Sequence, residues 1–173
     1  MAGPVTLLLK VSLPVLLLGI ILLIVTLVSP HWFSAGSLND NSYAGLWKAC
    51  GSVKGNTVCV SYDGSPSWIA GPEALECMAL SCGLAAFGLA FKMLFRNTKI
   101  TSILATLLAA LSGILGICGA GYFYHKETND PLFSDTAWCF YVNIVSDVIM
   151  LAGSVVLLVH TVRMPRGDYT AVN

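Results

Sequence analysis

Asp147 is a carboxylate inside an apolar run that is long enough to cross a membrane. An ionisable group at membrane depth is costly, which makes it a functional candidate by default. Asn143 lies four residues earlier on the same helical face and can share a hydrogen-bonding partner with it. Counting back from Val162 places Asp147 in the outer part of its helix, within reach of water. A structural hydrogen bond or interfacial solvation is the simpler interpretation, and a functional role is the alternative.

The other polar candidates lie near the expected helix ends. Glu73 and Glu76 fall at the expected start of a second helix, where a helix N-terminus offsets negative charge, so we expect capping, with cation binding as the alternative. His31, His125 and His160 are scattered over both membrane faces and predict no metal site. No nucleophile, base and stabilising group share one segment, so the sequence predicts neither an enzyme nor a cofactor.

Six cysteines are present, and two of them lie in a polar segment. Cys50 and Cys59 are separated by eight residues that include a Gly-Asn turn signal, a spacing that suits a hairpin bridge in an oxidising compartment. Two free thiols are the alternative. The remaining cysteines lie in or beside apolar runs and are interpreted as core thiols: Cys77, Cys82, Cys118 and Cys139.

The elements that must position these residues are membrane helices. Of the 173 residues, 56% are hydrophobic and only 10% are charged, against about 25% charged in an average soluble domain. The net charge is zero, which gives no attraction to nucleic acid and leaves the lipid bilayer as the expected partner. Four runs reach the roughly 20 apolar residues that a membrane span requires. The sequence predicts an all-α membrane protein, a four-helix transmembrane bundle with helices at about 8–29, 74–95, 100–124 and 138–162.

The positive charges predict the orientation of the chain. Lys and Arg stay on the cytosolic side during insertion, and six of the nine fall on one side of the predicted spans. We expect a multi-pass protein of the plasma membrane with cytosolic N- and C-termini. Extracellular loops are expected at about 30–73 and 125–137, with a cytosolic tail at 163–173.

The third span and the first loop carry further signals. Gly116 and Ala120 form a small-xxx-small pair, which predicts either packing inside the bundle or a lateral contact with another helix. The first loop contains short runs of strand composition between turn signals, such as the run from Thr57 to Tyr62. A small extracellular antiparallel sheet is the natural interpretation.

The first loop also resembles a known family. A Trp after the first span, a Gly-Leu-Trp and two cysteines, in that order, are similar to the signature of the claudin and peripheral myelin protein superfamily. These residues are Trp32, Gly45, Leu46, Trp47, Cys50 and Cys59. The resemblance implies one claudin-like domain over residues 1–173, with a sheet above the bundle. It also implies that the Trp and Gly-Leu-Trp residues seat that sheet on the bilayer surface.

The resemblance implies a function as well. Claudin-like proteins are structural components of cell junctions that assemble side by side in the membrane, as homo- or hetero-oligomers, and contribute to cell adhesion or to a paracellular barrier at tight junctions. The alternative is an auxiliary subunit of an ion channel or receptor, with Gly116 and Ala120 or Asp147 at the contact, or a membrane-organising protein of the peripheral myelin protein type. The chain ends in the polar Asn173, which disfavours binding to PDZ scaffolds.

Overall fold

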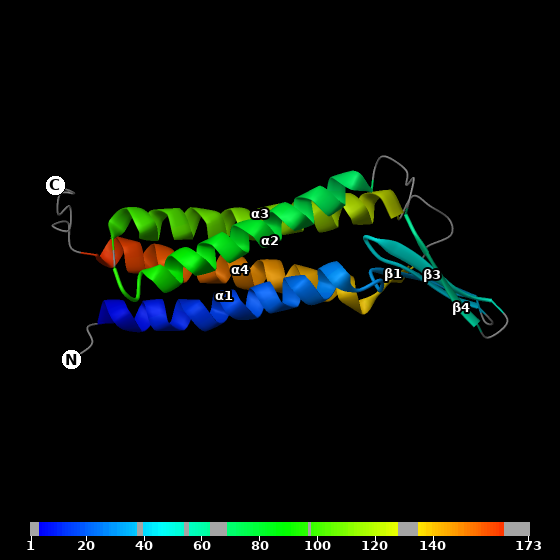
Figure 1. The fold of residues 1–173 in the computed structure, drawn as a ribbon, viewed down its shortest axis with the longest axis horizontal. Helices are drawn as coiled ribbons and strands as arrows, with labels where there is room; N and C mark the ends of the chain where they lie inside the picture. Colours follow the sequence, from blue (N-terminus) through cyan, green and yellow to red (C-terminus); the bar gives the residue numbers. More distant parts are fainter. Residues whose placement is uncertain are drawn as a thin grey trace.

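A computed structural model describes residues 4–37, 40–53, 56–62, 69–96, 98–127 and 135–164. Four long helices form a bundle, and short strands form a sheet beyond one end of it (Figure 1). The helices are α1 (Pro4–Val28), α2 (Ala70–Lys92), α3 (Lys99–Glu127) and α4 (Trp138–Arg163). All four are long and apolar enough to cross a membrane. The predicted class, a four-helix membrane bundle with a small antiparallel sheet, is confirmed.

Helix boundaries differ from the expected ones by a few residues. Helix α2 begins at Ala70 rather than at 74, and it ends at Lys92 rather than at 95. The earlier start includes Pro72, which a helix tolerates in its first turn because the N–H that proline lacks has no intrahelical acceptor there. Helix α3 continues to Glu127, beyond the expected 124. The tail from 165 onwards and most of the second loop lie outside the described residues.

The bundle is built on three extensive helix pairs: α2 with α3, α1 with α4, and α3 with α4. Its interior holds apolar side chains from all four helices, including Leu16, Ala86, Ala109 and Met150. Large apolar side chains also cover the outside, as helices that face lipid require. The bundle therefore has a largely apolar exterior, and it also buries several polar side chains in its interior.

All strands pair antiparallel in one sheet, in the order β4-β3-β2-β1-β5. The strands are β1 (Phe33–Ser37), β2 (Asp40–Ala44), β3 (Lys48–Val53), β4 (Asn56–Ser61) and β5 (Asp135–Thr136). Strands β1 to β4 come from the first loop, and β5 adds two residues of the second loop to the edge at β1. The sheet thus draws on both loops and lies at the end of the bundle opposite the start of α1 and the end of α4 (Figure 1).

A second apolar cluster joins the sheet to the bundle. Its buried members come from the first loop, from α3 and from α4: Trp32, Phe33, Leu46, Ala120, Phe123 and Cys139. Because side chains of the first loop and of the helices share one core, the sheet is held against the helix ends.

Candidate functional site

Trp32 lies at the junction between the sheet and the bundle. Its ring meets Phe123 of α3 edge-on at a centroid distance of 5.5 Å, and Phe140 of α4 at 6.5 Å. The indole Nε1 donates a hydrogen bond to the carbonyl oxygen of Thr26 at 2.8 Å. The side chain is fully buried. The aromatic side chains of α3 and α4 surround it, and it anchors the loop inside the protein.

Gly45 allows two backbone segments to touch. A Cβ on this residue would lie 2.5 Å from the Cα of Pro30 and 2.7 Å from the carbonyl oxygen of Ser29. Both neighbours are backbone atoms that cannot rotate away, so only glycine fits. The main-chain N–H of Trp32 donates to the carbonyl of Ala44 at 2.9 Å in the same region. The backbone at the end of β2 is therefore in direct contact with the backbone that follows α1.

Leu46 and Trp47 complete this junction from the other side. Leu46 is fully buried, whereas Trp47 keeps 42% of its surface exposed. The Trp47 indole Nε1 donates to the carbonyl oxygen of Leu27 at 2.7 Å. Helix α1 ends at Val28, and the last four carbonyls of a helix have no intrahelical donor. The two indoles of the signature, on Trp32 and Trp47, thus satisfy two successive carbonyls at the end of α1.

The expected disulfide is present between Cys50 and Cys59. The two residues are direct cross-strand partners in β3 and β4, so the bond locks the outer hairpin in this register. The bridge lies at the side of the sheet remote from β5, where β4 pairs with β3 alone among the described strands.

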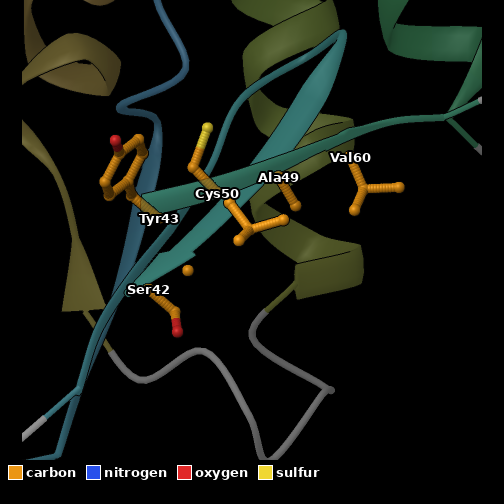
Figure 2. Close-up of a pocket in the computed structure, with 7 residues that line it drawn as sticks. Ser42, Tyr43, Ala49, Cys50 and Val60 are labelled. Atoms are coloured by element: carbon orange, nitrogen blue, oxygen red, sulfur yellow. The ribbon is translucent and has the colours of Figure 1, made fainter. Parts of the chain in front are cut away.

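The outer hairpin presents a shallow apolar groove. Cross-strand register aligns Ser42, Gly51 and Val58 in one row, with Ala49 and Val60 two residues along on the same face. These side chains, with Tyr43 and Cys50, line a space of about 270 Å³ across β2, β3 and β4 (Figure 2). Val58 and Val60 are 55% and 64% exposed. Strand β4 is the last strand of the described sheet, and it is exposed along its whole length.

A family model described as the PMP-22/EMP/MP20/Claudin family matches residues 5–158. That range takes in the described sheet and at least most of every helix. The chain belongs to this family. No curated protein matches it. Membership of the PMP-22/EMP/MP20/Claudin family confirms the resemblance of the first loop.

This family member holds a buried polar cluster between its helices. Asn143 Nδ2 donates to Glu76 Oε1 at 3.1 Å and to Asp147 Oδ2 at 3.2 Å. Thr26 Oγ1 donates to Asn143 Oδ1 at 2.8 Å. All four side chains are fully buried. The water-accessible position expected for Asp147 is therefore wrong, because the helices close around it, while Asn143 does bond to it.

Glu76 is the residue whose place the sequence interpretation missed. It was expected to compensate the helix N-terminus, but it points into the bundle. A signal was available, because the buried face of α2 is a stripe of small residues at helical spacing, and Glu76 lies on that stripe. The stripe consists of Pro72, Glu76, Ala79, Gly83, Ala86 and Ala90.

The small residues of α3 also face inward in this family member. A Cβ on Gly116 would overlap the Asp147 carboxylate, and Ala120 is buried in the junction core. Both residues serve packing inside the bundle, and neither lies on an outer face. Within the described residues, no group of three or more His, Cys, Asp or Glu is placed to hold a metal ion. His31 stacks on Tyr43 at a ring-centroid distance of 4.3 Å, and His160 is buried.

Proposed function

We propose that this protein is a structural component of cell junctions that assembles side by side in the membrane and contributes to adhesion or to a paracellular barrier. The observation that carries the proposal is the edge of β4, which pairs on one side only among the described strands. An edge strand presents unpaired N–H and C=O groups and is a template for pairing with another chain. Here the edge is backed by the apolar groove and by two half-exposed valines, Val58 and Val60.

The sheet is held rigidly against the helices, which favours the same proposal. The junction core, the indole bonds to Thr26 and Leu27 and the close backbone contact at Gly45 hold the sheet at a fixed position above the helices. A fixed sheet presents its edge at a constant height over the bilayer, so neighbouring copies in one membrane meet edge to edge. We expect the neighbour to be a second copy or a related family member.

The proposed orientation places the sheet outside the cell and both termini in the cytosol. Positive charges gather at the end of the bundle opposite the sheet, as the cytosolic side of a membrane protein requires. Among the described residues, the cations at that end are Lys10, Lys92, Arg96, Lys99 and Arg163, against Lys48 and Lys126 at the sheet end. The disulfide in the sheet also fits an oxidising exterior.

The alternative function, an auxiliary subunit of a channel or receptor, drew on Gly116, Ala120 and Asp147 as lateral contacts. All three contact other parts of this chain inside the bundle. No observation therefore favours that alternative over assembly through the sheet.

The test is to express the tagged protein in fibroblasts that lack tight junctions and to examine their contacts by freeze-fracture electron microscopy. We expect continuous strands with the wild type. Val58→Lys/Val60→Lys places positive charge on the exposed face of β4 and should remove the strands, because neighbouring edges then repel each other. Thr57→Lys/Ser61→Lys is the matched control: it adds the same two charges on the opposite face of the same exposed strand, so strands should persist.

Two outcomes count against the proposal. Diffuse surface protein without strands in the wild type contradicts strand formation and favours the auxiliary-subunit alternative, which chemical cross-linking to a membrane partner would then identify. Equal loss of strands in both lysine variants contradicts the role of the groove face.

Cys50→Ser, which removes the disulfide, is expected to lose strands because the β3–β4 hairpin is no longer locked.

A further inference from the structure

Two buried carboxylates flank one amide in the outer third of the bundle. Asn143 donates both hydrogens of its side-chain nitrogen, one to Glu76 of α2 and one to Asp147 of α4. Its oxygen accepts from the Thr26 hydroxyl of α1. The amide therefore has no remaining donor, and its orientation is fixed by three helices. It separates the two acidic groups without supplying a positive charge to either.

One oxygen of each carboxylate has no hydrogen-bond partner in the described part of the chain: Oε2 of Glu76 and Oδ1 of Asp147. Both side chains are fully buried. Buried polar atoms are normally bonded, and a buried carboxylate charge needs a compensating cation. No side-chain cation of the described chain bonds to either group. The negative charge is therefore neutralised by something other than the described side chains, either a proton or a metal ion.

The neighbouring helices offer neutral groups to this pair. Helix α1 contributes the Thr26 hydroxyl, and α3 contributes glycine backbone: a Cβ on Gly116 would overlap the Asp147 carboxylate, and one on Gly119 would lie 3.0 Å from Glu76 Oε1. The other titratable side chains at the sheet end of these helices are Glu73 and Cys77 on α2, Cys118, Tyr122, Tyr124, His125 and Lys126 on α3, and Cys139 and Tyr141 on α4.

We propose that Glu76 and Asp147 form an intramembrane proton-binding site that retains at least one proton in the folded protein at neutral pH. A proton taken from water adds to one of the free oxygens and converts that carboxylate into a neutral carboxylic acid with an O–H donor. The two acidic groups then carry one negative charge or none, which is how two carboxylates that share a site behave.

A proton fits this site better than a metal ion does. Calcium takes six to eight oxygen ligands and magnesium requires an octahedral set, whereas the pair offers two free carboxylate oxygens. The side chains also lie directly against the glycine backbone of α3, which leaves no room for a hydrated ion on that side. A proton needs neither extra ligands nor extra space.

Infrared spectroscopy of the full-length protein in lipid nanodiscs at pH 7.5 tests the proposal. A protonated carboxyl has a C=O stretching band apart from the carboxylate bands, and this band shifts in D₂O. We expect the band in the wild type, and its loss in Glu76→Gln/Asp147→Asn, which keeps the shapes of both side chains. Glu73→Gln is the matched control, because Glu73 is one turn away on the same helix and only partly buried, so the band should remain.

Three results would overturn the proposal. The first is the absence of the band from the wild type. The second is a band that appears only when choline replaces sodium in the buffer, because a metal ion then occupies the site. The third is a band that survives in the double variant. If the double variant fails to fold, Glu76→Gln and Asp147→Asn are measured singly, and a band that neither variant shifts or weakens also overturns the proposal.

Discussion

Two tryptophans of this protein make nearly the same hydrogen bond but differ in burial, which gives a matched pair of substitutions. Trp32 donates to the carbonyl of Thr26 at 2.8 Å, and Trp47 donates to the next carbonyl, that of Leu27, at 2.7 Å. Trp32 is fully buried, and Trp47 is 42% exposed. Replacing each with alanine removes the same atoms and an equivalent bond, so the difference measures burial at the junction core.

The structure sets the expected size of the two effects. Trp32→Ala leaves a cavity among aromatic side chains of α3 and α4 and unpairs a buried carbonyl, so we expect a loss of about 3 to 5 kcal/mol in the free energy of unfolding. Trp47→Ala removes a half-exposed ring whose carbonyl partner can turn to water, and we expect a loss of about 1 to 2 kcal/mol. The gap between the variants is therefore about 2 to 3 kcal/mol, more than tenfold in the folding equilibrium.

Reversible unfolding of the two variants and the wild type in the same detergent micelle measures this gap. Trp32→Phe, which keeps an aromatic ring but loses the indole N–H, should fall between the wild type and Trp32→Ala. Equal losses for the two alanine variants would refute the reasoning, because burial of Trp32 would then contribute nothing. A larger loss for Trp47→Ala would show that the sheet is held from its exposed side.

Two further predictions concern the packing of α3 against α4 and the disulfide between Cys50 and Cys59. Gly116→Ala should destabilise the bundle by about 1 to 3 kcal/mol because its Cβ overlaps the Asp147 carboxylate, whereas Gly121→Ala, with no atom near its Cβ, should be neutral or slightly stabilising; micellar unfolding of both tests this. Cys50→Ala/Cys59→Ala should lose about 2 to 3 kcal/mol from the free energy of unfolding, and its stability should no longer respond to reducing agent, as the wild type's should. Equal behaviour of the two glycine variants, or an unchanged midpoint in the cysteine variant, would contradict these expectations.

The features that were predictable from the sequence are those that depend on local composition. Apolar runs of membrane length predicted four helices, and all four are present. A lipid bilayer accepts apolar side chains on every side of a helix, so this prediction does not depend on which face is buried. The strand composition around Thr57 predicted β4, and the spacing of Cys50 and Cys59 predicted a bridge that the register of β3 and β4 makes direct. None of these depends on how the helices rotate about their axes.

The features that were not predictable depend on that rotation. Whether Glu76 caps its helix or points inward is decided by which face of α2 meets α3, and the charge near a helix start is compatible with both. Asp147 is shielded from water only because Gly116 lets α3 approach it. Trp32 has the composition of an interfacial residue, but Phe123 and Phe140, about 90 or more residues further along the chain, enclose it.

The first-loop signature and the intramembrane carboxylates belong to one hydrogen-bonded chain. The indole of Trp32 bonds to the Thr26 carbonyl, the Thr26 hydroxyl bonds to Asn143, and Asn143 bonds to both Glu76 and Asp147. Thr26 connects the two regions, because its carbonyl accepts from Trp32 and its hydroxyl donates to Asn143. Removing one member of a buried hydrogen-bond network weakens more than one bond. We therefore expect the contact between Trp32 and Thr26 and the carboxylate pair to stabilise each other. We therefore expect polar groups within the bundle, together with the aromatic contacts around Trp32, to hold the first loop in place.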